Sequence, residues 1–206
     1  MIYDLSPAIS AALAVWPGDT PPTREVLLDI ASGHNITLST LRATVHLGAH
    51  ADAPSHYGSG GADIASVPLE HYLGPCEVMR VDAERGGLIS PAMLPRAVSA
   101  PRLLIATGTF PDPAVFDEDF AALSAELVDH LHRAGVLLVG IDSPSVDPFT
   151  SRDLPAHHRC LAHGMAILEG LALGGVPEGP YELIALPLRL AGFDASPVRA
   201  VLRKFP

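Results

Sequence analysis

The sequence predicts a mixed α/β fold of the α+β type, with a mixed sheet and few helices. Many short apolar segments have the length and composition of strands, whereas only three segments have helical character. Residues 103–105 and 136–139 are continuous apolar runs, which are typical of strands buried on both faces. The 206 residues show no repeat, low-complexity tract or linker, so we expect a single domain over residues 1–206.

The strand predictions follow the chain in order. We expect strands over residues 2–5, 25–30, 36–45, 77–81, 102–106, 136–141, 182–188 and 198–202. The 20 prolines are scattered between such segments and do not gather into one tract, so they punctuate the elements of a folded chain.

The helix predictions rest on apolar spacing and end signals. The clearest helix covers residues 118–134, where the apolar positions fall on one helical face: Phe120, Leu123, Leu127 and Leu131. Asp117 can cap its start, and Gly135 follows its end, where a left-handed residue is favoured. Shorter helices are expected over residues 156–162 and 91–98.

The charge balance limits the classes of partner. The formal net charge is −10, whereas nucleic-acid binding needs clustered lysine and arginine, so we expect no nucleic-acid partner. Charged residues make up 17% of the chain, below the ~25% of a typical globular protein. A surface with so few charges favours a subunit interface.

The two cysteines and the N-terminus bear on location. Cys76 and Cys160 form no spaced motif, and the N-terminus lacks the basic and apolar regions of a signal peptide. No apolar run approaches the ~18 residues of a membrane span. We therefore expect a protein of the reducing cytoplasm that makes no membrane contact.

Residues 42–56 alternate between apolar and ligand-type side chains. The odd positions from 43 to 53 are all apolar, while the even positions include His46, His50, Asp52 and His56. In an extended chain this alternation sends the two sets to opposite faces. One face can therefore bind a ligand while the other packs on the core.

The same segment must bend if its donors share a metal. His46 and Asp52 would lie about 20 Å apart in a straight strand, whereas metal bonds are only ~2.0–2.2 Å long. Gly48 and Pro54 permit a bend. A continuous helix fits less well, because it would turn Asp52 away from the two histidines and because Pro54 interrupts it.

The donor types in this segment indicate a metal. Three imidazoles and one carboxylate favour zinc first, with manganese or iron as alternatives. The other interpretation is a cluster of surface histidines without a metal, which leaves the alternation and the small neighbouring residues unexplained.

A second group of candidate ligands follows later in the chain. His157 and His158 are adjacent, so both cannot easily face one metal, and Glu169 lies in an apolar run that predicts burial. A buried carboxylate needs a partner, which a metal would provide, unless Glu169 reaches solvent at a strand end. Cys160 is better explained as a buried apolar residue, and His163 as a helix C-terminal residue.

The motifs of this sequence resemble those of a known family. Residues 46–56 have the His-x-Gly-x-His-x-Asp-x-Pro-x-His pattern of the cyclase-like metal-dependent hydrolases. The similarity extends over nearly the whole chain, through residues 16–19, 140–148, 164–170, 185–188 and 192–200. These stretches are most similar to the bacterial kynurenine formamidases (arylformamidases) within that family.

The resemblance implies a swivelling β/β/α fold, a homodimer and two zinc ions per subunit, with manganese or another divalent metal as the alternative. It also implies the ligands. His46, His50 and Asp52 would bind one ion. Asp52 and Glu169 would bridge to the second, which His157 would also bind; His157 is preferred to His158 because its distance from Glu169 matches the family pattern.

The resemblance also implies a reaction. N-formyl-L-kynurenine would be hydrolysed to L-kynurenine and formate, a step of tryptophan degradation, with His56 as proton donor and acceptor. Trp16 would line the substrate pocket, although a hydrophobic plug under a loop explains that residue nearly as well. Thr107 and the two residues after it, at a strand end, could contact substrate, but a plain turn explains them better.

The sequence is also compatible with other functions. A family hydrolase acting on a cyclic amide such as isatin, or on another amide or ester, would carry the same motif. A non-catalytic zinc-binding protein would need a closed site, often with cysteine ligands. An acidic interaction module would leave the alternation in residues 42–56 without a cause.

Overall fold

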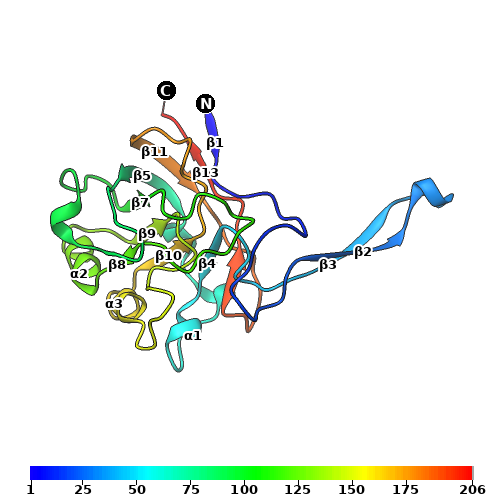
Figure 1. The fold of residues 1–206 in the computed structure, drawn as a ribbon, viewed down its shortest axis with the longest axis horizontal. Helices are drawn as coiled ribbons and strands as arrows, with labels where there is room; N and C mark the ends of the chain where they lie inside the picture. The colour runs from blue at the N-terminus through cyan, green and yellow to red at the C-terminus, as the bar shows by residue number, and fades with distance from the viewer. Residues whose placement is uncertain (206) are drawn as a thin grey trace.

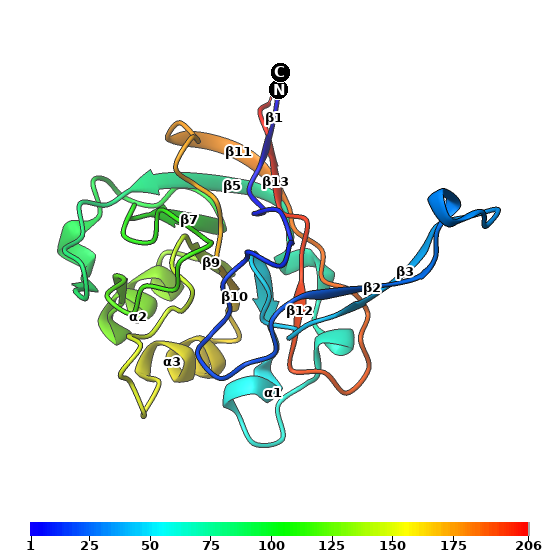
Figure 2. The ribbon, with the colours of Figure 1, turned by 45° about the vertical axis from the view of Figure 1, so that its right-hand side comes forward.

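The computed structural model describes residues 1–205 and confirms a mixed α+β fold. Its centre is one curled nine-stranded sheet (Figures 1 and 2). The strands in spatial order are β1 (Ile2–Asp4), β13 (Val201–Arg203), β11 (Gly179–Ile184), β5 (Leu73–Arg80), β7 (Arg102–Ala106), β9 (Leu138–Ile141), β10 (Ala166–Glu169), β4 (His50–Asp52) and β12 (Ala195–Pro197).

Four neighbouring strands of the sheet run parallel. β5, β7, β9 and β10 pair in parallel, while the strands that flank them pair antiparallel. The carboxyl ends of the parallel strands therefore meet at one edge of the sheet, which is where open α/β sheets bind ligands. β4 lies antiparallel beside β10, so the first residue of β4 reaches that same edge.

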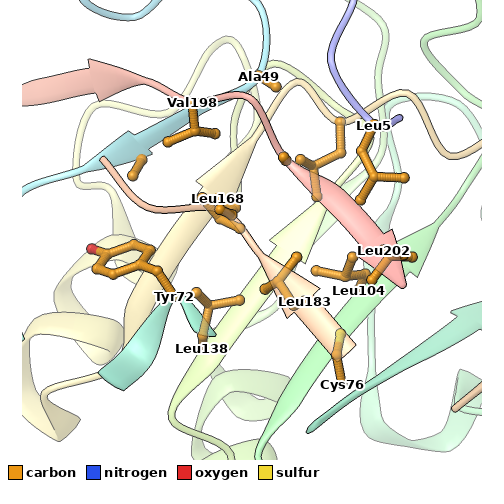
Figure 3. Packing of buried hydrophobic residues seen from close by; sticks show 14 of the residues in the cluster. Leu5, Ala49, Tyr72, Cys76, Leu104, Leu138, Leu168, Leu183, Val198 and Leu202 are labelled. Atoms are coloured by element: carbon orange, nitrogen blue, oxygen red, sulfur yellow. The ribbon is translucent and has the colours of Figure 1, made fainter. Parts of the chain in front are cut away.

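Both faces of the central strands β7, β9 and β10 are buried. In β7, Leu104 (Figure 3) and Ala106 enter the core enclosed by the curl, whereas Leu103 and Ile105 belong to the cluster that packs against the helices. The helices α2 (Ala125–Arg133) and α3 (Pro155–His163) cover this second face, and Leu127 and Cys160 pack there. Burial on both faces explains why these strands read as continuous apolar runs.

The structure corrects two helix predictions. The helix expected over 118–134 begins only at Ala125, because the Ser124 hydroxyl accepts the backbone N–H of Leu127 at 3.0 Å and caps it. Before that cap, β8 (Ala122–Leu123) pairs with β6 (Leu88–Ile89). The helix expected over 91–98 is a single 3-10 turn, Pro91–Met93.

The expected strands are present, all with shifted ends except β7, and sequence reasoning missed several short ones. The missed strands include β4, β10 and β12, each only three or four residues long. Strands of this length are too short to show periodicity by themselves. The short helix α1 (Pro54–Tyr57) was also missed; it follows β4 directly and begins at the proline that ends the alternating segment.

One hairpin leaves the body of the molecule. β2 (Thr23–Leu28) and β3 (Leu38–Arg42) pair antiparallel and extend away from the sheet as an arm (Figures 1 and 2). We call residues 23–42 the arm. Within residues 1–205, no helix is long and apolar enough to cross a membrane.

Candidate metal centre

The pairing of β4 with β10 places the first donors together. His50 is the cross-strand partner of Glu169, so both side chains point to the same face of the sheet. His50 Nε2 lies 3.3 Å from Glu169 Oε2 and 3.5 Å from Asp52 Oδ1. Ala51 lies between His50 and Asp52 in sequence, and its side chain is buried in the core on the opposite face of the sheet, as the alternation predicts.

A turn at Gly48 brings His46 back to the strand. Gly48 has φ +57°, and its carbonyl accepts the Nδ1–H of His50 at 2.8 Å. His46 Nδ1 then lies 3.1 Å from Asp52 Oδ1. The chain bends at the glycine that the spacing argument selected. Gly170 faces this turn so closely that a Cβ there would lie 2.3 Å from the Gly48 carbonyl oxygen.

The helix α3 supplies the remaining imidazole. His157 Nε2 lies 3.4 Å from Asp52 Oδ2 and 3.5 Å from Glu169 Oε1, and its side chain is buried. His158 is exposed on the outer side of the helix. The structure thus brings His157, and not its neighbour, to the carboxylates.

Asp147 fixes the orientation of His157. Its Oδ2 accepts the imidazole Nδ1–H at 2.7 Å and the backbone N–H of His157 at 3.0 Å, and its Oδ1 accepts the backbone N–H of Ala156. A carboxylate on the far nitrogen selects the tautomer whose Nε2 is free to bind a metal. Glu169 is held similarly, because its Oε1 accepts the Val146 backbone N–H at 2.7 Å.

The buried donors fit a metal better than they fit one another. Among the described residues, His50 Nε2 and both carboxylate oxygens of Asp52 are buried without a hydrogen-bond partner. Leaving a buried carboxylate unpartnered is costly. The imidazoles approach these oxygens at 3.1–3.5 Å, and the edge of a tetrahedron with ~2.0–2.1 Å metal bonds is about 3.3–3.4 Å.

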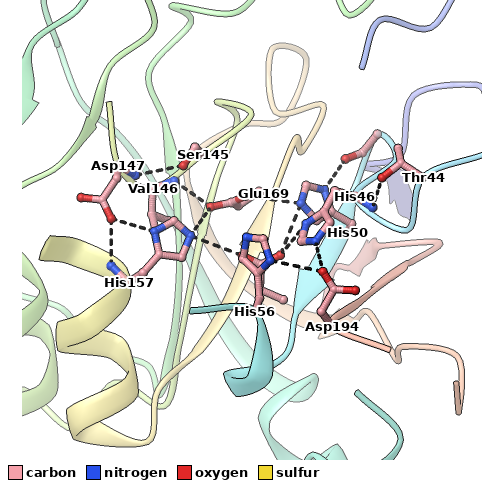
Figure 4. Close-up of polar contacts among 12 residues, drawn as sticks. Thr44, His46, His50, His56, Ser145, Val146, Asp147, His157, Glu169 and Asp194 are labelled. Carbon is pink, nitrogen blue, oxygen red and sulfur yellow. Dashed lines mark hydrogen bonds and ion pairs between the residues drawn. The ribbon is translucent and has the colours of Figure 1, made fainter. Parts of the chain in front are cut away.

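The donor atoms fall into overlapping groups (Figure 4). Donor atoms of His50, Asp52 and Glu169 lie within 4.8 Å of one another, as do those of His46, Asp52 and His56. Asp52 belongs to both groups and offers a separate oxygen to His157. A carboxylate placed in this way can bridge two cations.

Burial and the neighbouring charges shift the pKa values of the site residues in opposite directions. Burial disfavours protonated His46 and His157, but the carboxylates around them prevail and raise the pKa of His46 to about 9 and that of His157 to about 12. Burial likewise opposes ionised Asp52, but the neighbouring imidazoles lower its pKa well below its ordinary value. Divalent cations would compete with protons for these atoms.

His56 lies beside this group but in a different setting. It is on α1, with a side chain that is 35% exposed, and its Nδ1 lies 3.3 Å from Asp194 Oδ2. The same oxygen lies 3.0 Å from His46 Nε2. His56 is therefore the most accessible imidazole of the cluster and is held by a carboxylate.

An apolar cavity of about 820 Å³ opens onto the donor atoms. His46, His50, His56, His157 and Glu169 all contribute to its wall. Trp16 lines it as well and packs against Phe149 and Phe116, with ring centroids 4.9 and 5.4 Å away. Trp16 thus packs within an aromatic cluster and also faces the cavity.

The family model described as "Putative cyclase" matches residues 3–148. The chain belongs to the cyclase family. The matched part includes the histidine-rich segment at residues 46–56 and ends after Asp147.

Solved structures share the cyclase-family fold over the full chain. A "potential metal-dependent hydrolase with cyclase activity" is 28% identical, with a TM-score of 0.83, and the match covers 100% of this chain and 99% of that one. A "predicted metal-dependent hydrolase" from Bacillus stearothermophilus is 28% identical, with a TM-score of 0.82 and coverages of 98% and 97%. Isatin hydrolase A from Labrenzia aggregata, bound to benzyl benzoate, is 21% identical with a TM-score of 0.80, covering 98% and 93%, and shows likeness of fold.

Sequence reasoning on this cyclase-family chain missed two carboxylates of the site. Asp147 is hydrogen-bonded to His157, and Asp194 is hydrogen-bonded to both His46 and His56. The sequence analysis gave neither carboxylate a role. No spacing rule could have found Asp194, because its contacts lie 138 and 148 residues away in sequence. Capping rules could not have found Asp147 either, because the N-cap position of α3 is Leu154, although Asp147 accepts the backbone N–H groups of Ala156 and His157 in the first turn.

Proposed function

We propose that the chain is a metal-dependent amide hydrolase that converts N-formyl-L-kynurenine to L-kynurenine and formate. The observation that carries the proposal is a cluster of histidine and carboxylate donor atoms beside an aromatic cavity, in which His50 Nε2 and both Asp52 oxygens are buried without a hydrogen-bond partner. The cyclase-family membership and the metal-dependent hydrolases of like structure support it.

The ligand set is the one that the family resemblance implies, and the distances between the donor atoms support it. His46, His50 and Asp52 would hold one ion, while His157 and Glu169 would hold a second that shares Asp52. Nitrogen and carboxylate donors suit zinc, and also manganese. A bound divalent ion would lower the pKa of a coordinated water and polarise the formyl oxygen.

His56 is placed to move the proton. With Nδ1–H donated to Asp194, its Nε2 carries the free electron pair and can accept a proton from the attacking water. The water oxygen forms a bond to the formyl carbon, and the carbon–nitrogen bond breaks. His56 then returns the proton to the leaving aniline nitrogen, so that formate and the amine are released.

The cavity wall matches an aromatic substrate. Trp16, Phe110 and Phe116 give it aromatic surface on which an aryl ring can stack. Asp19, also on the wall, offers a carboxylate that can pair with the ammonium group of an amino acid.

A second candidate is the hydrolysis of a neutral cyclic aryl amide such as isatin. Among residues 1–205, the side chains lining the cavity include no lysine or arginine, so none supplies a cation for a substrate carboxylate. A neutral ring would need none. The fold shared with isatin hydrolase A is compatible with this reaction.

A direct assay separates the candidates. The chelated protein should be inactive, and added zinc should restore formate release from N-formylkynurenine. His56→Ala should retain the metal and lose about 10²–10⁴-fold in turnover. Faster opening of isatin than of N-formylkynurenine would select the second candidate. Full activity of the metal-free protein would contradict both.

A further inference from the structure

Leu154 has a backbone conformation that bulky residues rarely adopt. Its φ is +42° and its ψ is +55°, which is the left-handed region. Among residues 1–205, it is the only residue other than glycine with a positive φ. In this region Cβ lies too close to the following carbonyl oxygen. The next residue is Pro155, and a residue before proline is normally extended. Leucine is therefore an unfavourable residue for this position.

Hydrogen bonds on both sides hold the backbone of Leu154 in this conformation. Its N–H donates to the Ser151 hydroxyl oxygen at 3.2 Å, and its carbonyl accepts the backbone N–H of His158 at 3.0 Å. The next two N–H groups along the chain donate to Asp147, both at 3.0 Å. The first turn of α3 thus takes no hydrogen bond from the side chain at position 154. A glycine could make the same backbone hydrogen bonds without the strain.

The side chain of Leu154 gives a reason for leucine at this position. It is half-buried, packs against the apolar cluster between the sheet and the helices, and lines the cavity that opens onto the donor atoms. His157 follows three residues later, in the first turn of α3, and lines the same cavity. The wall therefore has an aliphatic side chain within one helical turn of a proposed metal ligand. Strained residues of this kind concentrate at binding and catalytic sites.

We propose that Leu154 is a specificity-determining residue, whose side chain packs against the aryl ring of an amide substrate. The inference rests on the proposed function and narrows its substrate class to anilides, in which the ring is bonded directly to the amide nitrogen. In an anilide only that nitrogen separates the ring from the reacting carbonyl carbon. A carbonyl at the donor atoms therefore brings the ring to the part of the wall where Leu154 offers apolar surface. A small N-alkyl formamide lacks this contact.

Two substitutions at position 154 separate the side chain from the backbone conformation. Leu154→Ala removes most of the side chain and keeps the strain, whereas Leu154→Gly removes both. Leu94→Ala and Leu94→Gly are the matched controls. Leu94 is also half-buried and packs against the same apolar cluster, but it has an ordinary φ of −66° and does not line the cavity.

The first readout is the binding of acetophenone, a neutral aryl ketone without a hydrolysable bond, to the purified protein with added zinc. Trp16 is the single tryptophan and lines the cavity, so its emission reports binding there. The Kd should rise at least about fivefold in Leu154→Ala and in Leu154→Gly, since both lose the same apolar contact. It should be unchanged in the two Leu94 variants. A wild-type protein that does not bind acetophenone would overturn the proposal, as would an unchanged Kd in Leu154→Ala.

Denaturant unfolding checks the strain at Leu154. Leu154→Gly should unfold at a higher denaturant concentration than Leu154→Ala, because glycine has no steric penalty in the left-handed region. At Leu94 the order should be reversed, since alanine restricts the unfolded chain more than glycine and fits the ordinary φ. The same order of alanine and glycine at both positions would contradict the strained conformation.

Selectivity in hydrolysis is the third readout. The ratio of kcat/KM for formanilide to kcat/KM for N-methylformamide should fall at least about fivefold in Leu154→Ala and stay unchanged in Leu94→Ala. An equal loss on the two formamides would contradict the proposal. A wild-type protein that binds acetophenone with the expected dependence on Leu154 but releases no formate would support the Leu154 contact and contradict the proposed reaction.

Discussion

A single oxygen of Asp194 lies 3.3 Å from Nδ1 of His56, although 138 residues separate the two in sequence. The same oxygen lies 3.0 Å from Nε2 of His46. Asp194 thus joins the proposed proton carrier to a proposed metal ligand through one carboxylate. Such partners set the tautomer and the orientation of a catalytic imidazole.

Asp194→Asn should lower kcat by about 10–100-fold, because the amide no longer stabilises a protonated His56. KM should change little, since Asp194 is not among the residues that line the cavity. Steady-state kinetics with zinc-loaded protein measures both. Asp82→Asn changes an exposed carboxylate that does not line the cavity; it is the control and should retain wild-type kcat. A kcat for Asp194→Asn equal to that of the control would remove Asp194 from the mechanism.

Adjacent histidines on α3 give a matched pair for metal content. His157→Ala should lose one metal equivalent per chain, because its Nε2 faces Asp52 and Glu169. His158→Ala should keep both equivalents, because that side chain is exposed. Elemental analysis after gel filtration measures the two variants. Equal metal contents in the two variants would contradict the assigned ligand.

Gly170 should tolerate no side chain. Its φ is +64°, and an added Cβ would lie 2.3 Å from the Gly48 carbonyl oxygen. Gly170→Ala should lower the free energy of unfolding by at least about 1–2 kcal/mol and weaken metal binding, because the His46–His50 turn must move. Gly174→Ala is the control, since nothing lies within 4 Å of its Cβ position. Denaturant unfolding of both variants checks the difference.

Glu77 should make stability depend on pH away from the metal site. Burial raises the pKa of this carboxyl, but Ser99 and Arg96 outweigh burial and hold the pKa below the ordinary value of 4.5. Its oxygens accept the Ser99 backbone N–H at 3.0 Å and the Arg96 Nε–H at 2.9 Å. Because the folded pKa is lowered, the stabilisation is present above about pH 4.5 and disappears as pH falls through the folded value.

The measurement is the difference in unfolding free energy between wild type and Glu77→Gln. At pH 7 the variant should be less stable by about 1–3 kcal/mol. The difference should shrink below pH 4.5. Glu178→Gln removes an exposed carboxylate from the same Arg96 and should cost less. A difference between wild type and Glu77→Gln that stays constant down to pH 3 would show that the carboxylate charge does not stabilise the fold.

The sequence predicts that His46, His50 and Asp52 come together, and the structure places them side by side, because the cause is local. Alternation fixes which side chains share a face, and bond lengths require the bend that Gly48 makes. The choice of His157 over His158 follows from the phase of α3, which the sequence left open and for which the family pattern favoured His157. Asp194 was out of reach, since its position depends on the pairing of β12 with β4.

The fold can be predicted from the sequence to a similar extent. Strands buried on both faces are evident from their apolar runs, and β7 appears with the expected ends, Arg102–Ala106. The helix expected over 118–134 is shortened by a cap at Ser124 that competes with Asp117. That residues 23–42 leave the body could not be read from their composition, because exposed and buried apolar strands look alike in sequence.

The cross-strand pairing of His50 with Glu169 has a consequence for folding. A slip of one residue between β4 and β10 would turn His50 and Asp52 to the opposite face and separate them from His157. Only the native register would then bind metal, so binding would select that register by mass action. The ions proposed for catalysis would therefore also stabilise the native strand register. Refolding without them should yield more chains with misaligned strands.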